Sequence, residues 1–146
     1  MNLRRRMLST LVFFVWFAIA GMMMHEAAHA LAVSVFGGTA RISYEFIGPL
    51  PIAGVTTYDG VTSDQAMIAD FAGGLGAAVM LLVVWYWAWR SKTLSDTNLE
   101  FATAVNVWLQ AVYGVAEGFL NNDQGTIVLI ALGAAVLGFA IVSPKV

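Results

Sequence analysis

Residues 7–36 read MLSTLVFFVWFAIAGMMMHEAAHALAVSVF, an apolar run of about 30 residues with a polar cluster near its end. About 20 apolar residues are enough to cross the hydrocarbon core of a bilayer. The run therefore predicts a membrane-spanning helix, which the pair Gly37-Gly38 is expected to end. Arg4–Arg6 and the small residues before Gly21 also fit a secretory signal peptide. We expect the segment to be retained, because cleavage there would remove most of the helix that carries the cluster.

The polar cluster is the string His25-Glu26-Ala27-Ala28-His29, an instance of H-E-x-x-H. Residues four apart on an α-helix project from the same face, so the two imidazoles can meet one ion. Neutral imidazole nitrogens bind zinc at roughly 2.0–2.1 Å. Glu26, between them, is placed to accept a proton from a water molecule on the metal. The string predicts a zinc site with Glu26 as general base.

The cluster fits a packed core, a di-iron site or a haem site less well. A histidine on an apolar face of a soluble helix is usually a core residue, but an ionisable group at bilayer depth costs about 2.5–3.5 kcal/mol. Three such groups together indicate a functional site. Glu26-x-x-His29 also fits half of a di-iron carboxylate site, which needs a second E-x-x-H, and the chain has no third histidine. One haem cannot take both histidines as axial ligands, because they project from one side of one helix.

The composition is that of a membrane protein. Of 146 residues, 60% are hydrophobic and 11% are charged, whereas charged residues make up about a quarter of a typical soluble domain. We expect residues 1–146 to form a single transmembrane domain. The net charge of −2 gives no indication of nucleic-acid binding. The chain has no cysteine, so a zinc ion must be held by histidine and carboxylate.

The segment from Gly37 to Ser63 differs from the rest in its periodicity. Polar and apolar residues alternate over Arg41–Phe46, the pattern of a half-buried strand. Gly48-Pro49-Leu50-Pro51 indicates a turn or an extended break, and Val55–Tyr58 predicts a second strand. We expect a small β-hairpin or sheet between the first two helices.

Three further apolar segments complete an all-α membrane protein of about four transmembrane helices. They cover Gln65–Trp89, Asn98–Leu120 and Thr126–Val142. The small residues of Ala72–Ala78 predict close helix packing, as small residues usually do in membranes. Tryptophan and tyrosine at residues 85–89 form an interfacial belt at the end of the second segment.

Helices that alternate in direction bring the remaining acidic residues to the end that carries HEAAH. Asp70 lies near the start of the second span on that side, Glu117 lies near the end of the third, and Asp123 lies in the turn that follows. A catalytic zinc takes three protein ligands and keeps one open position. Asp123 is the favoured third ligand, because it begins the next helix and can point back into the bundle. Glu117 is the alternative and Asp70 a less suitable candidate, while Asp123 could instead be a helix N-cap.

The motif and its surroundings resemble one family. HEAAH followed by Ala30-Leu31-Ala32 and by Phe36-Gly37-Gly38 resembles the site-2-protease-like membrane zinc metallopeptidases. Residues 72–77 partly match their A-G-P-x-x-N stretch, and Asp123-Gln124-Gly125 looks like the L-D-G element that supplies their third ligand. The resemblance implies Zn²⁺ on His25, His29 and Asp123. The chain departs from the family pattern at Gly74 for proline, at Ala77 for asparagine and at Gln124, which separates the aspartate from its glycine.

The leading hypothesis is a multi-pass intramembrane zinc endopeptidase that cuts peptide bonds in or near transmembrane segments of other membrane proteins. Its partners would be a substrate or partner helix and the lipid bilayer of a cell or an organelle. Strands around Ile42–Phe46 could hold the unwound substrate by strand addition. The alternative is a non-catalytic subunit of a larger membrane complex with a structural metal clasp. Basic residues gather on one side, so the positive-inside rule predicts cytoplasmic N- and C-termini: Arg4–Arg6, Arg90, Lys92 and Lys145.

Overall fold

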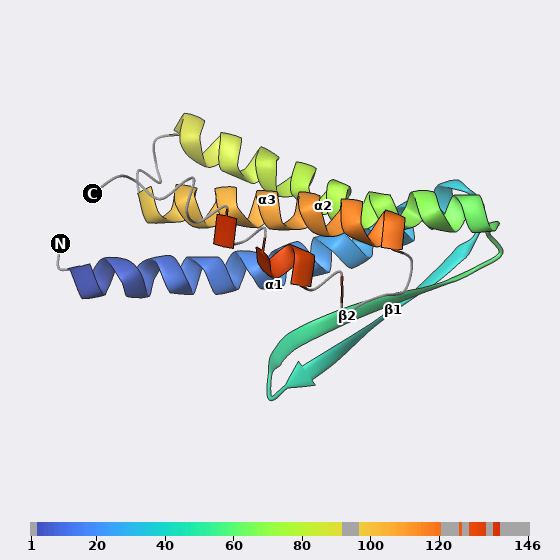
Figure 1. The fold of residues 1–146 in the computed structure, drawn as a ribbon, viewed down its shortest axis with the longest axis horizontal. Helices are drawn as coiled ribbons and strands as arrows, with labels where there is room; N and C mark the ends of the chain where they lie inside the picture. The colour runs from blue at the N-terminus through green and yellow to red at the C-terminus, as the bar shows by residue number, and fades with distance from the viewer. Residues whose placement is uncertain (1–2, 92–96, 121–125, 127–128, 134–135, 138–146) are drawn as a thin grey trace.

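The computed structural model describes residues 3–91, 97–120, 126, 129–133 and 136–137. Three long helices lie side by side, and a β-hairpin extends from the end at which the first helix stops and the second begins (Figure 1). In chain order the elements are α1 (Leu3–Val35), β1 (Thr39–Ile47), β2 (Leu50–Asp59), α2 (Ser63–Ser91) and α3 (Thr97–Leu120). The expected hairpin between the first two helices is confirmed.

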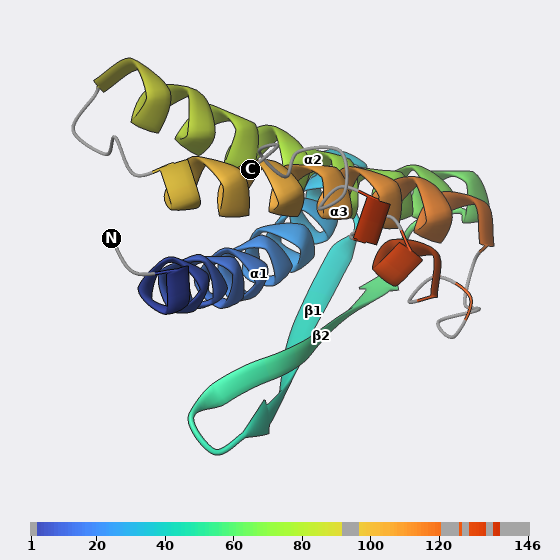
Figure 2. The same cartoon turned by 60° about the vertical axis from the view of Figure 1, so that its left-hand side comes forward.

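The hairpin is longer than its sequence pattern predicted. Antiparallel pairing runs from Thr39↔Asp59 to Ile47↔Leu50, with one irregularity between Glu45 and Phe46. Pro51, which we expected in the turn, belongs to β2 and pairs at this irregularity, where a missing backbone N–H is tolerated. The hairpin diverges from the helices toward its turn (Figure 2).

The end of α1 is fixed by a Schellman motif. The Gly38 N–H donates to the Val33 carbonyl at 3.1 Å and the Gly37 N–H to the Ser34 carbonyl at 3.0 Å. Gly37 has φ of 79°, the left-handed conformation that this cap requires and that glycine adopts without steric cost. The expected stop at Gly37-Gly38 is confirmed, and it directs the chain straight into β1.

The start of α2 carries a capping box. The Gln65 backbone N–H donates to Thr62 Oγ1 at 3.4 Å, and the Thr62 N–H donates to Gln65 Oε1 at 2.9 Å. These reciprocal bonds satisfy two donors that would otherwise lack partners at a helix N-terminus. The turn between β2 and α2 is thereby fixed, and with it the position of β2 beside α1.

All three helices pack against one another, and both strands contact α1. α2 and α3 approach each other closely, because a Cβ at Gly74 would lie 2.3 Å from Gly114 Cα. The close packing expected for Ala72–Ala78 is therefore confirmed. The buried core between the helices consists largely of small side chains: Ala69, Ala77, Ala78, Leu81, Ala102 and Val105.

The fold class agrees with the sequence prediction at a coarse level: a mostly helical chain with a two-stranded antiparallel sheet after the first helix. Within the described residues, two helices are long and apolar enough to cross a membrane, over Thr10–Val35 and Ser63–Trp87. The described residues of the fourth expected segment, 126, 129–133 and 136–137, are helical.

Candidate metal centre

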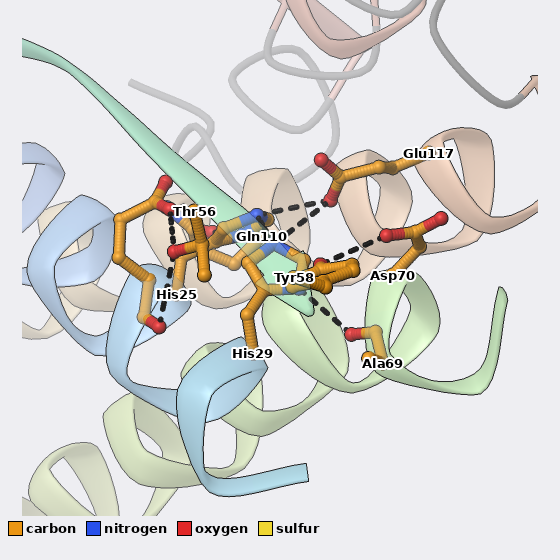
Figure 3. Close-up of polar contacts among 9 residues, drawn as sticks. His25, His29, Thr56, Tyr58, Ala69, Asp70, Gln110 and Glu117 are labelled. Atoms are coloured by element: carbon orange, nitrogen blue, oxygen red, sulfur yellow. Dashed lines mark hydrogen bonds and ion pairs between the residues drawn. The ribbon is translucent and has the colours of Figure 1, made fainter. Parts of the chain in front are cut away.

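Three acceptor atoms from two helices converge at the hairpin end of the bundle. His25 Nε2 and His29 Nε2 from α1 lie 2.8 Å apart. Glu117 Oε2 from α3 lies 3.0 Å from His25 Nε2 and 3.4 Å from His29 Nε2 (Figure 3). Both histidines are buried. His25, His29 and Glu117 are a group that could hold a metal ion.

The other nitrogen of each imidazole has an acceptor partner. His29 Nδ1 lies 2.7 Å from the Ala69 backbone carbonyl, which can only accept, so this nitrogen carries a hydrogen. His25 Nδ1 lies 3.2 Å from Gln110 Oε1, which also accepts. Neutral rings with a hydrogen on Nδ1 present a lone pair at Nε2. The surroundings thus select the tautomer that a metal ion requires.

The three converging atoms are all acceptors, so a cation between them would stabilise an arrangement that they cannot stabilise by hydrogen bonds to one another. Two Nε2 lone pairs face each other, and Glu117 Oε2 is buried without a hydrogen-bond donor within the described part of the chain. The sides of their triangle, 2.8, 3.0 and 3.4 Å, are close to the roughly 3.3 Å between ligand atoms of a tetrahedral zinc with bonds of about 2.0–2.1 Å. An ion here would satisfy all three.

Glycines on neighbouring helices make room for the histidines and their partners. A Cβ at Gly73 would lie 2.3 Å from His29 Cε1 and Nε2, so only glycine lets α2 approach this imidazole. A Cβ at Gly21 would lie 2.8 Å from Gln110 Nε2, the amide that holds His25. The small residues at 72–78 therefore serve the site as well as the helix contact.

Glu26 lies beside the triangle without being one of its three corners. It is 5% exposed, and its Oε2 accepts a hydrogen bond from Thr56 Oγ1 at 2.6 Å. A Cβ at Gly54 would lie 2.6 Å from Glu26 Cγ, so β2 covers this carboxylate closely. The side chain lines the same cavity as the two histidines.

A second chain of polar contacts reaches His29 from the hairpin. Tyr58 Oη on β2 lies 2.8 Å from His29 Nδ1 and donates to Asp70 Oδ1 on α2 at 2.9 Å (Figure 3). Burial, followed by the hydrogen bond and charge of Asp70, raises the pKa of Tyr58 well above its usual range. The phenol therefore stays protonated and remains a donor to Asp70.

The triangle opens into a cavity of about 870 Å³, within the range of about 300–1,000 Å³ typical of ligand pockets. Its polar lining residues are His25, Glu26, His29, Thr56, Tyr58, Asp70, Gln110, Tyr113 and Glu117. The remaining lining residues are apolar and come from all three helices, β2 and the C-terminal segment: Ala18, Ile19, Met22, Pro51, Ile52, Ala53, Gly54, Val55, Ala66, Leu109, Ala131 and Leu132.

The structure brings together most of the residues that the sequence singled out. The predicted convergence holds for Asp70 and Glu117, which lie at the same end as His25 and His29. Asp123, the favoured third ligand, lies outside the described residues. Within the described ranges, Glu117 is the carboxylate that meets both histidines.

Sequence reasoning missed four residues that shape this site: Thr56, Tyr58, Gly73 and Gln110. Gln110 carried a usable signal, since an amide within an apolar helix usually has a polar partner. Thr56 and Tyr58 carried none, because threonine and tyrosine are ordinary strand residues.

Comparisons with known proteins do not place this chain in a family. No protein-family model, no curated protein and no solved structure matches this chain.

Proposed function

We propose that this chain is an integral membrane zinc peptidase that hydrolyses peptide bonds in or beside transmembrane segments of other proteins. The observation that carries the proposal is the arrangement of His25, His29 and Glu117 around one point, with Glu26 lining the same cavity. Two histidines and a carboxylate, with a fourth position left for water, are a common ligand set of catalytic zinc.

Zinc is the metal that this donor set favours. Two imidazole nitrogens and one carboxylate oxygen suit zinc better than magnesium or calcium, which prefer oxygen ligands alone. The chain has no cysteine, which excludes thiolate centres. We assign the third ligand to Glu117, because its Oε2 reaches both Nε2 atoms.

The protein's own residues have separate roles in the proposed reaction. His25, His29 and Glu117 hold the ion, and Glu26 takes a proton from the attacking water and returns it to the leaving amine. When bound, zinc would activate this water and polarise the scissile carbonyl. Gln110 and the Ala69 carbonyl keep both imidazoles in the binding tautomer.

A membrane location is supported by the two long apolar helices and by their large exposed apolar side chains. We propose that α3 and the segment beginning at Thr126 are further passes. The termini would face the cytoplasm, on the evidence of the basic residues. A cytoplasmic N-terminus predicts that a tag fused there resists protease added outside intact cells.

A substrate helix must unwind before it is cut, because helical carbonyls are already hydrogen-bonded. The hairpin, whose strand β2 lines the cavity, would hold the unwound segment by strand addition. The apolar cavity wall fits a substrate that comes from within the bilayer.

Glu26→Gln tests the proposal. Glutamine keeps the size of the side chain and the acceptor for Thr56, but it cannot take a proton. We expect zinc to be retained and cleavage of a model transmembrane substrate to fall by about 10²–10⁴-fold. Zinc content is measured by elemental analysis, and cleavage by gel assay in detergent or liposomes.

Three results would contradict the proposal. A wild-type protein purified without zinc would overturn it outright. Zinc that is present while function is unchanged in Glu26→Gln would favour a structural metal clasp in a non-catalytic subunit. If Glu26→Gln strips the metal, Glu26 is a ligand and the assignment of roles is wrong.

A further inference from the structure

The face of β2 that looks toward α1 carries three residues that contact the H-E-x-x-H helix. Alternate residues of a strand share a face, and Gly54, Thr56 and Tyr58 form such a series. Gly54 and Thr56 meet Glu26, and Tyr58 meets His29. Thr57, on the opposite face, is exposed and donates a hydrogen bond within the hairpin, to the Arg41 carbonyl at 3.4 Å.

We infer that β2 is an integral part of the metal centre: Thr56 is a positioning residue for Glu26, and Tyr58 is a positioning residue for His29. The inference deepens the proposed function and rests on it where Glu26 is concerned. The Tyr58 part rests only on metal binding.

The contact between Thr56 and Glu26 has the geometry of a strong hydrogen bond. At 2.6 Å it lies in the range of hydroxyl-to-carboxylate bonds. The bond fixes Glu26 Oε2. Because Oε1 is not part of this bond, that oxygen can receive the proton. A general base must lie within hydrogen-bond reach of its proton source, so an unrestrained carboxylate would lose much of its effect.

The absence of a side chain at residue 54 makes this position of Glu26 possible. A Cβ there would lie 2.6 Å from Glu26 Cγ and 2.8 Å from Oε1. Backbone on one side and the Thr56 hydroxyl on another thus confine the carboxylate.

Tyr58 is a second hydrogen-bond partner of His29, and it connects the hairpin to Asp70 on α2. The Nδ1 hydrogen of His29 faces both the Ala69 carbonyl and Tyr58 Oη, and the phenol donates onward to Asp70. Such outer partners fix the ring orientation of a metal-bound histidine, and their removal usually costs about 10–100-fold in metal affinity or activity.

The Thr56 arm of the experiment uses purified full-length protein, zinc analysis and cleavage of a model transmembrane peptide. Thr56→Val removes the hydroxyl and keeps the shape, Thr56→Ser restores a hydroxyl, and Thr57→Val is the matched control on the outer face. We expect Thr56→Val to lower kcat by about 10–100-fold with unchanged KM and zinc, because Thr56 would act through Glu26. Thr56→Ser should recover most of the rate, and Thr57→Val should resemble wild type.

The outcomes of this arm separate the inference from the proposed function. If wild type cleaves and Thr56→Val cleaves equally well, the inference about Thr56 is wrong and the peptidase proposal stands. An equal loss in Thr57→Val, or no recovery in Thr56→Ser, assigns the effect to hairpin stability and also overturns it. If zinc-loaded wild type cleaves nothing, the peptidase proposal fails and the role of Thr56 fails with it.

The Tyr58 arm needs no cleavage assay. Tyr58→Phe removes only the hydroxyl, and Tyr86→Phe on the exposed face of α2 is its control. We expect Tyr58→Phe to lower zinc affinity, measured by competition with a chelator, by about tenfold. This is the low end of the usual range, because the Ala69 carbonyl still accepts from Nδ1. Equal affinity in Tyr58→Phe and wild type would overturn this half of the inference.

Discussion

The two halves of α1 belong to one continuous helix and have opposite surroundings. In the first half, large apolar side chains are exposed, and Trp16 is 67% exposed. In the second half, His25, Glu26 and His29 are each at most 5% exposed. In a water-soluble protein, the apolar side chains would be expected to be buried and the polar ones exposed. The second half still exposes Leu31 and Val35, by 61% and 76%, so it is the polar cluster and not the whole half that is buried. Exposed apolar side chains together with a buried polar cluster fit the proposed membrane location.

The difference comes from what the rest of the chain offers each half. The second half meets glycines from β2 and α2, at residues 54, 73 and 76, where a Cβ would lie within 2.8 Å of α1 side-chain atoms. Backbone can therefore approach closely and supply carbonyl partners. Polar groups so deeply buried need partners of this kind, because each unpaired one costs about 1–3 kcal/mol.

The largest expected effect compares matched double variants in the two halves. His25→Ala with His29→Ala should reduce bound zinc from about one ion per chain to none, because two of three ligands are lost. Leu11→Ala with Val15→Ala has the same spacing in the exposed half and should keep the metal. Elemental analysis of both proteins measures the zinc content. Equal zinc contents in the two double variants would show that His25 and His29 do not bind the metal.

The third ligand provides a sharper test. Glu117→Gln should reduce zinc affinity by more than the roughly 10–100-fold that outer-shell changes cost, because it removes a charged ligand atom that reaches both histidines. Asp123→Asn, chosen because the sequence favoured Asp123, should have the smaller effect. Chelator competition on both variants ranks them, and the opposite order would return the ligand role to Asp123.

The smallest expected effect concerns glycine. Gly73→Ala places a Cβ 2.3 Å from the His29 ring, so it should lower stability by about 1–3 kcal/mol and weaken zinc binding. Gly133→Ala, where a Cβ meets nothing within 4 Å, should be neutral or stabilising by up to about 1 kcal/mol. Thermal unfolding in detergent measures the stability of both variants. Equal melting temperatures would show that α2 can move away from His29 and accommodate the added methyl group.

Much of this protein could be predicted from local pattern. The hairpin, the stop of α1 at Gly37 and the small-residue contact of α2 each depend on signals within a few residues, and the structure has all three. The strand bounds were less accurate, because Pro51 suggested a break and the irregular pairing at Phe46 accommodates it. The partners Thr56, Tyr58 and Gln110 lie 30, 29 and 85 residues from the side chains they hold. No local pattern marks Thr56 or Tyr58, and the amide of Gln110 within an apolar helix indicates a polar partner without identifying it.

The sequence by itself determined the helix that carries His25, Glu26 and His29, since periodicity and spacing alone place both imidazoles on one face. Only the tertiary structure decided what surrounds them: Glu117 at the two Nε2 atoms, acceptors at both Nδ1 atoms, and β2 over Glu26. The physical reason is that helix geometry depends on neighbouring residues. A metal centre depends on distances between elements, which close packing around glycine sets.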